Sequence, residues 1–174
     1  SDNWADPGKQ YKPAAWKELD FEALKQALYD HTFEVVSALA AQGTPPAMVQ
    51  VGNEINAGLL WPDGDYNHFD NMAALLSEGY RAVKDASPET LVMLHIAEGG
   101  DNDLARWWFD NITRRDVPFD VIGISYYPFW HGTLAQLQFN LNDISARYDK
   151  DVIVVETAYA FTFQEDDNLA NIVS

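Results

Sequence analysis

The chain has 174 residues, of which 47% are hydrophobic and 22% charged, a composition that is typical of a folded globular protein and excludes an intrinsically disordered one. Its formal net charge of -16 at pH 7 repels phosphate backbones and anionic lipids, so we expect neither nucleic acid nor a membrane as a partner. The sequence has no Cys, which excludes disulfide bonds and thiolate metal sites.

Four segments have apolar residues at helical spacing, and a loop precedes the first of them. The first helix is predicted to begin after Asp20 as its cap and to end at Gly43, with these apolar residues on one stripe: Leu24, Leu28, Val35 and Leu39. The other helices are expected over residues 69–86, 104–115 and 134–148, the last behind Thr133 as its cap.

Four short runs of β-prone apolar residues lie between these helices. They predict strands at residues 48–53, 91–96, 121–126 and 152–156. The segment 57–65, which follows the first strand, is apolar but rich in Gly and Pro, so we expect a loop there rather than a regular element.

The repeat of strand, loop and helix predicts a parallel β/α architecture, because unbroken Val, Ile and Leu strands are expected where both faces of a sheet are covered. Either an eight-fold barrel or an open doubly wound sheet fits this order. We favour the barrel, because no Gly-rich phosphate turn follows any strand and every strand ends on a residue capable of chemistry. A barrel needs roughly 250 residues, so the prediction is a partial (β/α)8 TIM barrel, a segment of one catalytic domain of a longer chain.

Glu54 and Glu156 each follow a long apolar run, at the expected ends of the first and last strands. A single Glu at a strand end is commonly a solvated loop residue, but its recurrence three β/α units later argues for a catalytic pair. Hydrolysis of a glycosidic bond needs one protonated and one ionised carboxyl group. The sequence therefore predicts that Glu54 and Glu156 are the two catalytic residues of a glycosidase.

Further side chains at the strand ends are candidates for binding substrate. Asn53 could hold a sugar hydroxyl, Tyr126 could donate a hydrogen bond to the nucleophilic carboxylate, and His95 could orient either carboxylate. Tyr126 could equally be a packed residue, and a single His such as His95 is more often a packed or hydrogen-bonded core residue. The aromatic residues that could line a cleft are Trp4, Trp61 and Trp130. No spacing of metal ligands indicates a catalytic metal, so we expect the chemistry to need no cofactor.

Four segments of the sequence resemble a known family. Residues 1–10 (SDNWADPGKQ), 51–56 (VGNEIN), 123–130 (GISYYPFW) and 155–159 (VETAY) closely resemble the arabinogalactan endo-β-1,4-galactanases of glycoside hydrolase family 53. The resemblance implies that this segment holds strands four to seven of a (β/α)8 barrel, and that Trp4 flanks the cleft. It further implies that Glu54 ends the fourth strand as acid/base and Glu156 ends the seventh as nucleophile.

The activity that the resemblance implies is retaining, endo-acting cleavage of β-1,4-galactosidic bonds by double displacement. The expected partner is a plant cell-wall polysaccharide, the galactan or arabinogalactan side chains of pectin. Two alternatives remain open at this point. One is another retaining β-glycanase of the same clan, such as a mannanase or cellulase, and the other is a non-catalytic carbohydrate-binding barrel.

Some bacterial members of this family bind a structural calcium ion after the seventh strand. The residues with oxygen ligands of the right type in this region are Asp166, Asp167, Asn168 and Asn171, although a solvated acidic loop is the more common explanation of such residues. We expect the complete protein to be a monomer. We also expect it to be extracellular, periplasmic or at the cell surface, with its export signal outside this segment.

Overall fold

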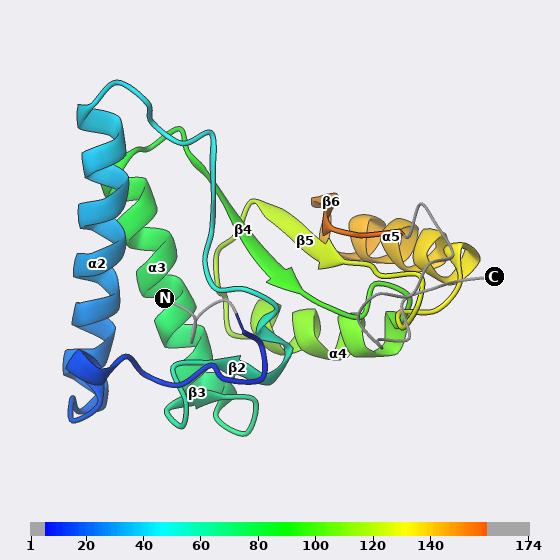
Figure 1. Ribbon diagram of the computed structural model, residues 1–174, viewed down its shortest axis with the longest axis horizontal. Coiled ribbons are helices and arrows are strands. Elements are labelled where there is room, and N and C mark those ends of the chain that lie inside the picture. Colours follow the sequence, from blue (N-terminus) through cyan, green and yellow to red (C-terminus); the bar gives the residue numbers. More distant parts are fainter. Residues whose placement is uncertain (1–5, 160–174) are drawn as a thin grey trace, which may run out of the picture.

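A four-stranded parallel sheet with helices packed against it forms the centre of the computed structural model, which describes residues 6–159 (Figure 1). The strand order is β1-β4-β5-β6. In chain order the α-helices, strands and 3₁₀-helices (η) are η1 (Ala14–Trp16), α2 (Phe21–Ala41), β1 (Met48–Gln50), η2 (Ile55–Ala57), β2 (Gly58–Leu59), β3 (Gly64–Asp65), α3 (Phe69–Ala86), β4 (Leu91–Ile96), α4 (Asn102–Thr113), β5 (Val121–Ser125), α5 (Leu134–Tyr148) and β6 (Asp151–Glu156).

Each strand of the sheet pairs in parallel with its neighbours, and a helix connects each strand to the next. Met48 pairs with Leu91, and Val121 of β5 lies between Met93 and Asp151. This arrangement confirms the predicted parallel β/α architecture.

The two faces of the sheet carry different residues. On β4 and β5 the side chains of one face join the hydrophobic core with the helices: Val92, Leu94, Ile96, Ile122 and Ile124 from the strands, and Leu75, Leu76, Trp108, Phe109, Ile112 and Ile144 from the helices. His95 and Ser125 alternate with these core residues and therefore face the opposite side. The candidate residue His95 therefore lies on that second side.

The helix ends follow from local sequence. The Asp20 carboxylate accepts a hydrogen bond from the backbone N–H of Ala23 at the start of α2, and Thr133 and Gln136 form a capping box at the start of α5. Leu28, Val35 and Leu39 of the predicted stripe line the same apolar depression between α2 and β1, so they share one face of the helix. Val36 beside them is buried, whereas Val35 is 45% exposed.

Three other local predictions need correction. The segment 57–65 is not a plain loop, because β2 and β3 form a short antiparallel pair within it. β1 ends at Gln50, so Glu54 does not directly end a strand. β5 ends at Ser125, and Tyr126 already belongs to the following loop.

No helix within residues 6–159 is long and apolar enough to cross a bilayer. Five residues that the sequence marked as candidates lie outside the described residues. They are Trp4 and the four expected calcium ligands, Asp166, Asp167, Asn168 and Asn171.

Candidate active site

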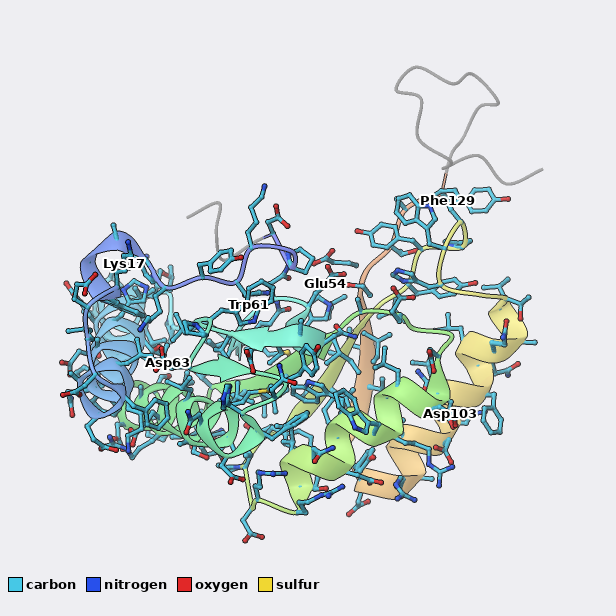
Figure 2. The ribbon with its side chains drawn as sticks, turned by 90° about the horizontal axis from the view of Figure 1, so that it is seen from below. Lys17, Glu54, Trp61, Asp63, Asp103 and Phe129 are labelled. Carbon is cyan, nitrogen blue, oxygen red and sulfur yellow. The ribbon has the colours of Figure 1, made fainter. Side chains whose placement is uncertain are left out.

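Glu54 lies in a tight turn beyond β1 and not on the strand itself. The chain reverses after Gln50 through Gly52, which has a φ of 85°, and Glu54 then adopts the left-handed conformation with φ 46° and ψ 53°. This conformation is uncommon for a residue with a side chain and persists only where the surroundings hold it. The turn aims Glu54 at the carboxyl edge of the sheet (Figure 2).

Hydrogen bonds from neighbouring elements hold this turn. The Asn56 side chain accepts from the Ala97 N–H over 2.7 Å and donates to the Ala97 carbonyl over 3.3 Å, which ties the turn to the end of β4. The indole N–H of buried Trp108 donates to the Ile55 carbonyl over 3.0 Å. The residues after Glu54 are therefore fixed to both β4 and α4, and Glu54 is held with them.

Glu156 reaches the same side of the sheet because of an irregularity in β6. Strict alternation would place Glu156 on the face of Val152, which packs against the core. The register between β5 and β6 shifts at Val155, so that Glu156 lies opposite Ser125. Paired residues of neighbouring strands project to the same face, so Glu156 joins Ser125 and His95.

Tyr127, and not Tyr126, contacts this carboxylate. The Tyr127 hydroxyl donates to Glu156 Oε2 over 3.1 Å, whereas the Tyr126 hydroxyl donates to the Gly132 carbonyl. The prediction that Tyr126 bonds the nucleophile was therefore wrong by one residue. The alternation of side chains along β5 could have revealed this. If it is continued past the strand, Tyr127 falls on the face of Ser125, whereas Tyr126 falls on the face of the core residue Ile124.

His95 lies beneath the two glutamates and is fully buried. Its Nε2 is 2.7 Å from the Ser125 hydroxyl, a contact that the sequence did not reveal. One ligand atom each from Glu54, His95 and Glu156 lie within 4.8 Å of one another. Chain segments far apart in sequence thus bring two carboxylates and an imidazole close together at the carboxyl edge of the sheet.

The surroundings shift the pKa of two groups at this point. Burial lowers the pKa of His95, and the nearby Glu156 carboxylate only partly offsets this effect, so the imidazole is held neutral. Burial also raises the pKa of Tyr127, and the hydrogen bond to Glu156 raises it further. The Tyr127 hydroxyl therefore keeps the proton that it donates to Glu156.

The same three side chains form a group within residues 6–159 that could hold a cation, since Glu54, His95 and Glu156 offer nitrogen and oxygen ligands. Paired carboxylates can nevertheless supply both the acid and the nucleophile of glycoside hydrolysis by themselves. The arrangement therefore holds the two carboxyl groups that acid–base and nucleophilic cleavage of a glycosidic bond requires.

The remaining sequence candidates differ in their relation to this site. Trp130 and Glu54 line one depression of about 370 Å³, whereas Trp61 is not among the described residues around it. The Trp61 indole N–H donates to the Ala57 carbonyl, and its ring packs edge-on against Tyr11. Asn53 lies beside Glu54, and its side-chain oxygen accepts a hydrogen bond from the Gln50 amide.

Comparison with known proteins identifies the family. The family described as glycosyl hydrolase family 53 matches residues 1–174. Among curated relatives, the arabinogalactan endo-beta-1,4-galactanase A of Emericella nidulans is 39% identical and is matched by 90% of this chain over 47% of its own length. The chain thus spans about half the length of the curated relatives it matches.

Solved structures agree with this result. The GH53 catalytic domain of Ignisphaera aggregans matches with a TM-score of 0.90 and 42% identity over 97% of this chain and 46% of that chain. A structure of fungal beta-1,4-galactanases matches with a TM-score of 0.86 and 38% identity over 91% of this chain and 50% of that chain. The parallel sheet is part of a (β/α)8 TIM barrel, as predicted, and the chain belongs to glycosyl hydrolase family 53.

Proposed function

We propose that the complete protein is a retaining, endo-acting glycoside hydrolase that cleaves β-1,4-galactosidic bonds in galactan and arabinogalactan. The observation that carries this proposal is the approach of the Glu54 and Glu156 carboxylates, whose ligand atoms lie within 4.8 Å of each other. The name of the Emericella nidulans relative, an arabinogalactan endo-beta-1,4-galactanase, supports the choice of sugar and linkage.

The separation of the carboxylates favours retention of configuration. Retaining glycosidases have carboxyl groups roughly 5 to 5.5 Å apart, whereas inverting ones leave roughly 6.5 to 9.5 Å for a water molecule. One oxygen of Glu54 lies within 4.8 Å of one oxygen of Glu156, which fits the shorter of these separations. A covalent glycosyl-enzyme intermediate is therefore the route that fits the site.

The hydrogen bond from Tyr127 supports a division of roles between the two residues. The Tyr127 hydroxyl donates to Glu156 Oε2 and so fixes the orientation of the carboxylate that would attack as the nucleophile. Glu156 forms a bond to the anomeric carbon while Glu54 donates its proton to the leaving oxygen. In the second step Glu54 removes a proton from water, which attacks the anomeric carbon, and Glu156 leaves as a carboxylate.

Several accompanying proposals concern the complete protein. Its substrate would be the galactan side chains of pectin in the plant cell wall, and it would act as a monomer outside the cytoplasm. Asn53, Trp4 and Trp130 would contact the sugar, and His95 would orient a catalytic carboxylate. A structural calcium ion at residues 166–171 would be detected by elemental analysis of the purified full-length protein.

The test is incubation of the full-length protein with β-1,4-galactan, mannan and cellulose, scored by newly formed reducing ends. We expect rapid release of oligosaccharides from galactan alone. Proton NMR of the first products should show the β-anomer, as double displacement requires. Cleavage of mannan or cellulose in preference to galactan would refute the substrate, an initial α-anomer would refute the mechanism, and binding of galactan without products would refute catalysis.

A further inference from the structure

The depression at Glu54 continues into a second, larger depression that the proposed chemistry does not use. The second has a volume of about 640 Å³ and lies between the loop that follows β4 and the start of α5. Glu98, Trp130 and His131 line both depressions, which therefore adjoin. Together they form a trough that leads from Glu54 over the β4–α4 and β5–α5 loops.

Contacts between these two loops make the second depression a preformed feature. The buried Asn140 of α5 donates to the Gly99 carbonyl over 2.8 Å and accepts from the Asn102 amide over 3.0 Å. Gly100 lies so close to the His131 carbonyl that a side chain at this position would collide with it. A ligand would therefore bind without having to order either loop.

The lining of the second depression combines aromatic rings with carboxylates, of which Asp101 caps α4 through Oδ1 and Glu98 lies 3.7 Å from His131 Nε2. Trp130 and Phe139 are 54% and 61% exposed, although large aromatic side chains are usually covered. The side chain of Glu98 is 48% exposed, and the exposed Asp101 and Asp103 lie beside it. Such a surface suits a sugar, which has apolar ring faces that pack on aromatic rings and hydroxyl groups that donate to carboxylates.

The position of Glu54 indicates which end of the polysaccharide chain would lie in the second depression. A general acid lies against the leaving group, because it donates its proton to the leaving oxygen. Glu54 lines the first depression, and Glu156 is not among the described residues that line either one. The second depression therefore lies beyond the leaving-group side of the bond that is cleaved, toward the reducing end of the chain.

We propose that the depression between the β4–α4 loop and α5 is a distal leaving-group subsite, which binds neutral hexose units of the polysaccharide on the reducing-end side of the cleaved bond. This inference rests on the proposed function. The carboxylates of Glu98, Asp101 and Asp103 would repel a chain of uronic acids, so the subsite selects neutral galactan over an acidic polysaccharide.

Two variants of the full-length protein test the subsite. Phe139→Ala removes one of the exposed aromatic rings that line the depression. Ala135→Trp fills the depression from an exposed position on α5. The matched control is Ala146→Trp, the same change at an exposed position of the same helix that does not line the depression. The substrates are long β-1,4-galacto-oligosaccharides labelled at the reducing end, and a nitrophenyl galactobioside, whose short leaving group does not reach the subsite.

We expect Phe139→Ala to lower kcat/KM on the long oligosaccharides by about 3- to 10-fold, the size of a lost aromatic packing contact. Ala135→Trp should lower it at least as much and shift the cleaved bond toward the labelled reducing end. Neither variant should change kcat/KM on the nitrophenyl substrate. The control Ala146→Trp should leave kcat/KM unchanged on both substrates.

Three outcomes would overturn the subsite. They are equal losses on both substrates, no loss on either, and a shift of the cleaved bond toward the non-reducing end. Failure of the unaltered protein to cleave any galactan would instead refute the proposed function, so the two failures can be told apart.

Discussion

The hydroxyl group of Tyr127 donates a hydrogen bond to Glu156 Oε2 over 3.1 Å. Tyr127 follows β5 and Glu156 ends β6, so this bond joins the ends of two neighbouring parallel strands. It orients the carboxylate. This contact carries the assignment of Glu156 as the nucleophile.

Tyr127→Phe should lower kcat/KM on galactan by about 10- to 100-fold. The variant removes a hydrogen bond to a charged group, which contributes roughly 1.5 to 3 kcal/mol. Steady-state kinetics of the full-length protein measure the loss. Tyr126→Phe is the matched control, because its hydroxyl bonds the Gly132 carbonyl, and it should lower the melting temperature more than the activity. A larger kinetic effect of Tyr126→Phe would reverse this assignment.

Glu54→Ala should have an effect that depends on the leaving group. A sugar leaving group needs protonation, and we expect its cleavage to slow by about 10²- to 10⁴-fold, the usual contribution of general acid catalysis. A dinitrophenyl glycoside needs no proton to leave, so its first step should be nearly unaffected, and azide should speed turnover by replacing water. The measurement compares kcat/KM on the two substrates. Equal losses on both would remove Glu54 from the acid/base role.

Trp108→Phe should affect both stability and activity. The change leaves the buried Ile55 carbonyl without the indole N–H, which costs about 1 to 3 kcal/mol of unfolding free energy. Because this bond helps to hold the turn of Glu54, kcat should fall as well. Urea denaturation and kinetics of the full-length protein measure the two effects. Trp107→Phe, at a position that is 43% exposed, is the control, and equal effects of the two variants would contradict this role of Trp108.

His95 should make stability depend on pH near neutrality. Its folded-state pKa is lowered by burial, so below the ordinary histidine pKa of about 6.5 the unfolded chain binds more protons than the folded one. The unfolding free energy should therefore fall as the pH drops below about 6.5, down to the folded-state pKa. Urea midpoints between pH 5 and 7.5 should show a smaller slope for His95→Gln than for the unaltered protein. Parallel curves would contradict the prediction.

Much of the local structure could be predicted because it depends on short-range patterns. Asp20 and Thr133 cap α2 and α5 as expected, and β4 has the predicted bounds, Leu91–Ile96. Segment 57–65 was harder, because the pairing of two-residue strands leaves no periodicity in the sequence. The burial of Val36 in place of Val35 likewise depends on which neighbours cover α2, and helical spacing does not contain that information.

The sequence by itself determined the order of β/α units, the family motifs and the two glutamates that follow apolar runs. Only the tertiary structure decided how these glutamates meet. Glu54 depends on a left-handed turn tied to β4 and α4, and Glu156 depends on a register shift that moves it to the face of Ser125. Successive side chains of a strand point to opposite faces of the sheet, so one extra residue moves every later side chain to the other face. That extra residue is set by pairing between strands and not by the local sequence.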